Sequence, residues 1–264
     1  FYQSPSQIFP GNHGVIKDEV FMWSASDFKW LRGNYPALKK TSSQMLEGRV
    51  YFQMLRLNGQ YFVNPSLSQI QQSAAPDYLY LCGSYGISIE WNQPNGLPMS
   101  RETGGKFAAV AARLGKDNKD MHIYPDGTLC LAAPMDLDIE LARGLRLETY
   151  IEGFLVPYLF AQTYYAKTRV WLWGELSHGV WGLLEWLGRK KDYESDDARR
   201  TYSRLLVYAK QENTDVKAIL ATRCRNHKPC PCGSTKKTRS CHPDVQPGIA
   251  RLRSAINSGL IETS

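Results

Sequence analysis

Four potential metal ligands lie close together near the end of this 264-residue chain. Cys230 and Cys232 are separated by one residue, and Cys241 and His242 are adjacent, with eight residues between the two pairs. Cysteine thiolates and a histidine nitrogen are ligands that zinc prefers, and a structural zinc site holds four of them in a tetrahedron. The segment has few apolar side chains, so its folding would depend on the ion. We therefore predict a structural Zn²⁺ site at these four residues.

A second group of reactive side chains lies at residues 122–131, His-Ile-Tyr-Pro-Asp-Gly-Thr-Leu-Cys-Leu. The Pro-Asp-Gly sequence predicts a tight turn, after which Cys130 would lie close to His122 or Tyr124. A partly exposed and hydrogen-bonded thiol at this place has the features of a nucleophile. Two interpretations follow from the residues alone: Cys130 is a nucleophile, or it is a small core residue between two leucines.

The metal-ligand segment, CPCGSTKKTRSCH at residues 230–242, closely resembles the SEC-C motif. That motif ends the SecA translocation motor and is appended to many bacterial proteins. The resemblance implies a bacterial origin and an interaction module held by zinc. It does not name the partner of the module.

The cysteine segment looks like the active-site segment of ubiquitin-conjugating enzymes, specifically of their bacterial relatives in antiphage and ubiquitin-like conjugation operons. In the eukaryotic enzymes a His-Pro-Asn triplet precedes the catalytic cysteine, which lies in a Gly-x-Ile-Cys-Leu context. Residues 127–131, Gly-Thr-Leu-Cys-Leu, match the cysteine side of this pattern. Ile123 and Tyr124 replace the proline and asparagine of the triplet, as also tends to be the case in the bacterial relatives.

The resemblance implies a cysteine acyltransferase. Cys130 would accept the C-terminal acyl group of a ubiquitin-like protein as a thioester and pass it to an amine. Tyr124, or backbone amides near Cys130, would take over the oxyanion contact of the missing asparagine. His122 would be structural or a proton-transfer group, and Asp126 would form the turn or orient and deprotonate an incoming lysine. The implied partners are an activating enzyme and a ubiquitin-like protein or nucleotidyltransferase, and the implied process is antiphage defence.

The elements that must position these residues follow from turn signals and from the change of hydrophobic period. An α+β fold is predicted, with an antiparallel meander and flanking helices, because helix, strands and helices follow one another in blocks. The Asn58-Gly59 pair predicts a hairpin at residues 48–63, and Gly83 divides the strand expected at residues 77–91. Residues 106–114 fit a strand or a helix. One or two helices are predicted at residues 141–168, with a kink or boundary at Pro157. The other predicted elements are a helix at 26–35 capped by Ser26 and Asp27, a loop at 92–98, a strand at 99–103, and helices at 174–187, 196–211, 214–222 (N-cap Thr214) and 248–259.

The charge of the chain is unevenly distributed. The formal net charge is +7, yet residues 1–188 hold 16 basic and 17 acidic residues while residues 189–264 hold 16 and 8. We predict a ubiquitin-conjugating-enzyme-like domain at 1–188, a basic helical linker at 189–225 and a zinc-binding tail with a short terminal helix at 226–264. The basic end is either a solvated surface or a surface for an acidic protein or nucleic acid.

Several classes of protein are disfavoured by the sequence. The 31 aromatic residues argue against disorder. The most apolar run, residues 151–166, contains Gly153, Pro157 and Gln162 and is shorter than the roughly 20 residues of a membrane helix. Residues 1–25 lack the pattern of a signal peptide, and the clustered cysteines fit a reducing compartment. We expect a soluble, cytoplasmic protein.

Two non-enzymatic functions remain open beside the acyltransferase. The chain is an inactive relative that binds a partner through the same surface, or an adaptor whose basic zinc tail binds protein or nucleic acid.

Overall fold

The computed structural model describes residues 23–91, 98–173, 176–177, 179–222, 227–230, 232 and 234–262. Residue contacts divide the chain into two compact units. The first unit comprises Phe1–Ala132 and Asp136–Gly174, and the second comprises Ala133–Met135 and Glu175–Ser264. Of the loop predicted at residues 92–98, only Pro98 belongs to the described part of the chain.

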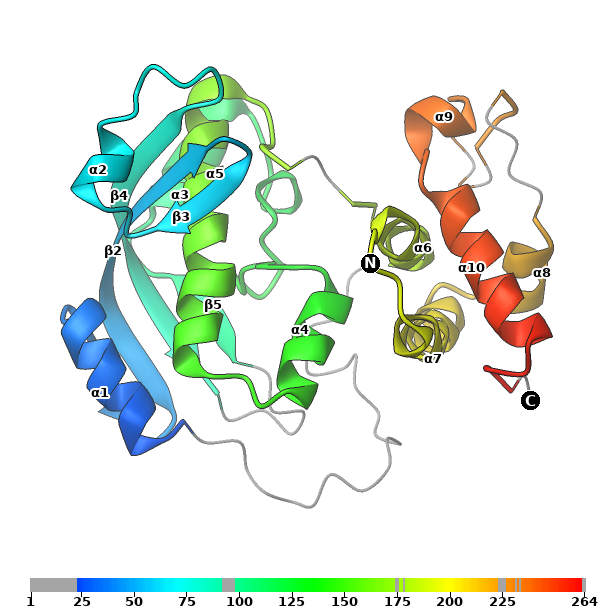
Figure 1. The fold of residues 1–264 in the computed structure, drawn as a ribbon, viewed down its shortest axis with the longest axis horizontal. Coiled ribbons are helices and arrows are strands. Elements are labelled where there is room, and N and C mark those ends of the chain that lie inside the picture. The colour runs from blue at the N-terminus through cyan, green and yellow to red at the C-terminus, as the bar shows by residue number, and fades with distance from the viewer. Residues whose placement is uncertain are drawn as a thin grey trace. The chain divides into compact units, whose positions relative to one another are not determined.

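An antiparallel sheet forms the centre of the first unit, which confirms the predicted α+β class (Figure 1). Four strands follow one another across the sheet in the order β1-β2-β4-β5, and β3 pairs with one end of β2. Burial alternates along β2, where Val50 and Phe52 face the core and Tyr51 faces solvent. The strands are β1 (Leu38–Ser42), β2 (Met45–Leu57), β3 (Gln60–Val63), β4 (Leu79–Glu90) and β5 (Met99–Glu102).

The predicted hairpin is confirmed, and the predicted break in the next strand is wrong. Asn58 and Gly59 have φ angles of 51° and 75°, as a tight primed turn requires, and Leu57 pairs with Gln60. In contrast, β4 continues through Gly83. A Cβ atom at Gly83 would lie 3.0 Å from the ring of Phe52 on β2, so this glycine makes room for a cross-strand aromatic ring.

Helices flank the sheet of the first unit. The π-helix Thr149–Leu155 leads directly into α5 (Val156–Thr168), with Pro157 in the first turn of α5. Helix α5 packs against β2 and β4 (Figure 1), and Leu155 of the π-helix and Leu159 and Phe160 of α5 are fully buried. The ambiguous residues 106–114 form a helix. The remaining helices are α1 (Ala25–Asn34), α2 (Leu67–Ile70), α3 (Lys106–Leu114), the 3₁₀-helix Lys119–Met121 and α4 (Pro134–Ala142).

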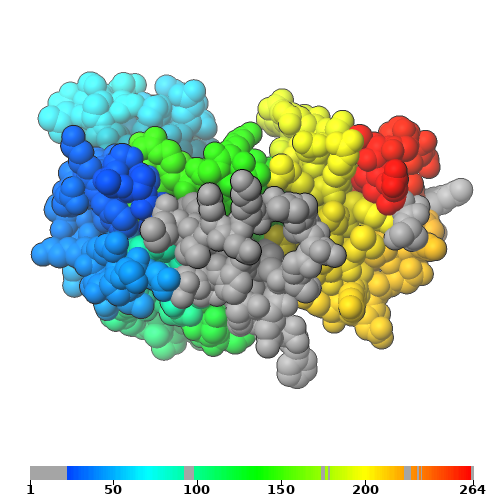
Figure 2. Space-filling model, turned by 90° about the horizontal axis from the view of Figure 1, so that it is seen from below, coloured from blue at the N-terminus to red at the C-terminus, as the bar shows by residue number. Residues whose placement is uncertain are grey.

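The caps of two helices differ from the sequence prediction by one or two residues. Ser24, rather than Ser26, is the N-cap of α1, where it forms a capping box with Asp27. Asp215, rather than Thr214, caps α8 (Val216–Ala221) by accepting the N–H of Lys217. The segment that contains α2, coloured cyan in Figure 2, lies at the surface of the first unit, and its Leu67 side chain is exposed.

The second unit is helical. Its long helices are α6 (Gly179–Arg189), α7 (Ser195–Gln211) and α10 (Val245–Asn257), and short helices are α8 and α9 (Thr238–Cys241). The sequence assigned α6 to the end of the first domain, but α6 packs against α7 and α10. The reason is a close crossing: Gly188 and Gly248 let the backbones of α6 and α10 meet. Among the described residues, no helix is both long and apolar enough to cross a membrane.

The crossing of α6 and α10 gives a direct test of the helical unit. A Cβ atom at Gly248 would lie 2.0 Å from the backbone oxygen of Leu184, so Gly248→Ala must push the helices apart. We expect a loss of about 1–3 kcal/mol in the free energy of unfolding, measured by denaturant titration. Gly33→Ala in α1 is the control, because nothing lies within 4 Å of its Cβ position. Equal stability of the Gly248 variant and the wild type would contradict the close crossing.

Candidate functional site

A small hairpin carries Cys130. The N–H of Tyr124 donates to the carbonyl of Thr128 at 2.8 Å, and Gly127, with φ of 82°, closes the turn between them. The N–H of Cys130 donates to the carbonyl of His122 at 2.8 Å. The hairpin is fixed to the edge strand β5, since the N–H of Leu129 donates to the carbonyl of Ser100. The structure thus brings His122, Tyr124 and Cys130 together.

The thiol of Cys130 is shielded from solvent by its surroundings. The residue is half-buried, and burial of the thiol raises the pKa of Cys130, while a hydrogen bond from the Tyr124 side chain acts in the opposite direction. The thiol is therefore mostly protonated at neutral pH. Tyr124 is the group that stabilises the thiolate, because its hydroxyl donates to the sulfur.

Asp126 and His122 have contacts of their own within the hairpin. A carboxylate oxygen of Asp126 accepts the N–H of Thr128 at 3.0 Å, and the other lies 4.0 Å from the guanidinium of Arg101. These contacts are those of a turn former. His122 has a left-handed backbone with φ of 52°, and its ring meets the edge of Trp171 at 4.5 Å between centroids. This ring contact joins the hairpin to the segment that follows α5.

Two buried residues near Cys130 did not emerge from the sequence as site residues. Tyr158 and Gln162 of α5 both bond to the backbone carbonyl of Met121. The available signal was Gln162 itself, a polar residue that interrupts an apolar run. Nothing in the sequence indicated that its partner would be a carbonyl 41 positions away.

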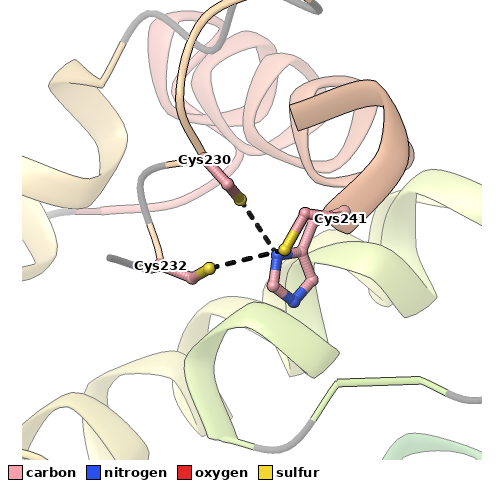
Figure 3. Close-up of side chains that lie close together, drawn as sticks. Cys230, Cys232 and Cys241 are labelled. Atoms are coloured by element: carbon pink, nitrogen blue, oxygen red, sulfur yellow. Dashed lines mark hydrogen bonds between the residues drawn. The ribbon is translucent and has the colours of Figure 1, made fainter. Parts of the chain in front are cut away.

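The second unit brings the four predicted metal ligands together, and Figure 3 shows the side chains of Cys230, Cys232 and Cys241 close to one another. The carbonyl of Lys228 accepts the N–H of Thr238, and that of Lys236 accepts the N–H of Cys230, which closes a loop before the one-turn helix α9. Cys241 ends α9 and His242 follows it. All four ligand atoms lie within 4.8 Å of one another, so Cys230, Cys232, Cys241 and His242 form a group that could hold a metal ion.

One distance in this cluster is close to that of a tetrahedral metal centre. Two thiolates in a tetrahedron with metal–sulfur bonds of about 2.3 Å are about 3.8 Å apart, and the sulfurs of Cys232 and Cys241 are 3.7 Å apart. The Cys230 sulfur lies 3.0 Å from Nδ1 of His242, so Nδ1 is the ring nitrogen that faces the thiols. Burial raises the pKa of Cys230, so a bound cation would have to favour its thiolate.

The surroundings of the cluster orient its ligands. The hydroxyl of Ser234 lies 3.0 Å from the sulfur of Cys241, and the ring of Trp181 on α6 lies 6.4 Å from that of His242. Cys230 and His242 are buried, while Cys232 and Cys241 are half-buried. The cluster is thus one part of the helical unit and is held by α6 as well as by its own loop.

Comparison with known proteins gives no match: no family model fits the chain, and neither the curated proteins nor the solved structures contain a significant relative.

Metal binding is the most direct property to measure. We expect the purified protein to hold one metal ion per chain by elemental mass spectrometry. Cys241→Ala removes one of four ligands and is expected to lower the metal content to the background level. Cys82→Ala is the matched control, because Cys82 is an exposed thiol on β4 of the first unit. Equal metal content in the two variants would contradict the assignment of the cluster.

Proposed function

We propose that the first unit is a bacterial ubiquitin-conjugating-like acyl carrier whose acceptor is Cys130. The observation that carries the proposal is the hairpin at residues 122–130, which holds a half-buried thiol against the hydroxyl of Tyr124. The order of elements supports it: a first helix, the strands of an antiparallel sheet, the helix α3, the cysteine segment and later a helix, α5, packed across the sheet. The sequence of residues 127–131 supports it independently, through its similarity to the cysteine side of the family motif.

Two chemical steps follow from this assignment. The Cys130 thiolate attacks the carbonyl carbon of an incoming thioester, a new C–S bond forms, and the donor leaves as its own thiolate. A lysine amine then attacks the Cys130 thioester, an amide forms, the amine loses a proton to solvent, and the Cys130 thiolate is released. Each attack places negative charge on the carbonyl oxygen. We assign the stabilisation of this charge to the Tyr124 hydroxyl, which hydrogen-bonds the Cys130 sulfur.

The metal of the second unit is, in our proposal, a structural Zn²⁺. Three thiolates and one imidazole form a ligand set typical of closed zinc sites. When bound, the ion contributes folding free energy to a segment with few apolar side chains. Its role is to hold the loop before α9 and α10, and the chemistry at Cys130 does not involve it.

The acyl-carrier proposal predicts a covalent adduct. A ubiquitin-like protein, prepared as its C-terminal thioester with 2-mercaptoethanesulfonate, is incubated with the chain and analysed by intact mass spectrometry. We expect one adduct that dithiothreitol releases, because a thioester exchanges with thiols. Cys130→Ala is expected to abolish the adduct, and Cys82→Ala, which removes a more exposed thiol, is expected to retain it. An adduct that survives Cys130→Ala, or none on the wild type, would refute the proposal.

A second candidate function is an adaptor that binds a polyanion through the metal loop. Lys228, Lys236, Lys237 and Arg239 are all exposed there, and the sequence contains no acidic residue between Asp215 and Asp244. Such a density of positive charge attracts nucleic acid phosphates or an acidic protein. This function requires no reaction at Cys130.

The adaptor function has its own test, fluorescence anisotropy with a labelled 20-mer DNA at several salt concentrations. Reversal of two charges by Lys236→Glu and Lys237→Glu is expected to reduce the salt dependence by about two phosphate contacts, each contributing a slope of about 0.9. Lys116→Glu with Lys119→Glu in the first unit is the charge-matched control. Binding that is lost equally in both double variants would show that only net charge matters.

A further inference from the structure

Two polar side chains of α5 extend to the backbone that precedes the Cys130 hairpin. The Nε2 group of Gln162 donates to the carbonyl of Met121 at 2.5 Å and to the hydroxyl of Tyr158 at 2.7 Å. The Tyr158 hydroxyl lies 3.0 Å from the carbonyl of Met121 and 3.3 Å from that of His122. Both side chains are buried, with exposed fractions of 2% for Gln162 and 5% for Tyr158.

This network connects α5 to the backbone of the cysteine itself. The carbonyl of His122 accepts the N–H of Cys130 at 2.8 Å and also faces the Tyr158 hydroxyl at 3.3 Å. The carbonyl oxygen of His122 is therefore a common hydrogen-bond acceptor for Tyr158 of α5 and for the backbone of Cys130. A shift of Tyr158 would move His122 and, through it, Cys130.

The arrangement is not the one that maximises stability. Among the described residues, the side-chain oxygens Oε1 of Gln162 and Oγ1 of Thr128 are buried without a hydrogen-bond partner, and each such group destabilises the folded state. His122 adds a left-handed backbone, with φ of 52°. An apolar residue of similar length at position 162 would avoid the unsatisfied oxygen. Three unfavourable features thus gather around one cysteine, which is typical of a functional site.

We infer that Gln162 and Tyr158 are positioning residues for Cys130, which fix the turn at Met121 and His122 so that the thiol faces Tyr124. This inference rests on the proposed acyl-carrier function for its purpose, but its geometry is testable without that function. Acyl transfer depends on orientation, and a displacement of the reacting atoms by about 1 Å costs up to about 100-fold in rate.

Gln162→Met separates positioning from stability, because methionine has a similar length and lacks both the donor and the unsatisfied oxygen. The carbonyl of Met121 keeps its bond from Tyr158. We expect unchanged or increased thermal stability, about tenfold slower loading of Cys130 from the acyl thioester, and faster alkylation of Cys130 by iodoacetamide. The exposed Cys82 of the same molecule serves as the internal rate reference.

The pH dependence of alkylation adds a signature that a purely structural role would not produce. The hydrogen bond from Tyr124 lowers the pKa of the Cys130 thiol, and the charge of the Cys130 thiolate raises the pKa of Tyr158. Burial raises the pKa of this thiol in the wild type. In Gln162→Met, the released thiol should be alkylated with a midpoint at lower pH, closer to that of an ordinary cysteine.

Tyr158→Phe should act in the same direction, since it removes the hydroxyl that bonds both carbonyls. The Gln162→Met/Tyr158→Phe double variant should load no more slowly than the slower single variant, because both residues act through the same turn. Thr163→Val is the matched control on α5. Its hydroxyl bonds Tyr85 and the carbonyl of Leu159, so this variant should lose stability without a change in Cys130 alkylation relative to Cys82.

The outcomes distinguish this inference from the acyl-carrier proposal. Loading that fails in the wild type would overturn the acyl-carrier proposal alone, and the alkylation rates would still test the positioning. The inference would be overturned if the rate of Cys130 alkylation and its pH midpoint stayed at wild-type values in both Gln162→Met and Tyr158→Phe. The inference would also be overturned if the changes in Cys130 alkylation simply followed the loss of thermal stability across all variants, including Thr163→Val.

Discussion

The carbonyl oxygen of Met121 lies in the interior of the first unit, where a backbone group without a donor is costly. Its residue is fully buried, and two side chains of α5, Tyr158 and Gln162, provide the hydrogen bonds. Because α5 is itself fixed by packing against β2 and β4, the position of the turn is coupled to the sheet. The position of this turn also sets the position of the hairpin, which begins at His122 and ends at Cys130.

The two units are stabilised by different physical means. The first has a large apolar core between a sheet and α5, with aromatic contacts such as that between Trp23 and Trp91, whose centroids are 4.6 Å apart. The second combines closely crossing helices with a loop that is poor in apolar side chains. A metal ion bound at that loop would add the free energy that the small local core cannot provide.

The agreement between sequence and structure follows the range of the interactions. The Asn58-Gly59 hairpin was predictable because the turn geometry depends on two adjacent residues. The metal cluster was predictable as a group because its ligands lie within 13 residues, 230–242. The role of Gly83 was missed because it depends on Phe52 in the neighbouring strand, and the grouping of α6 with α10 depends on two glycines 60 positions apart, Gly188 and Gly248.

The sequence by itself determined the α+β order of elements, the four metal-ligand candidates and the turn that brings Cys130 back toward His122. Each of these depends on residue types at short spacing, and local chain geometry carries such information. Only the tertiary structure decided that Tyr158 and Gln162 hold the Cys130 hairpin and that α6 belongs to the helical unit. Those contacts join residues that are distant in the chain, and they exist because the packing of a helix on a sheet, or of two helices at glycines, places them within reach.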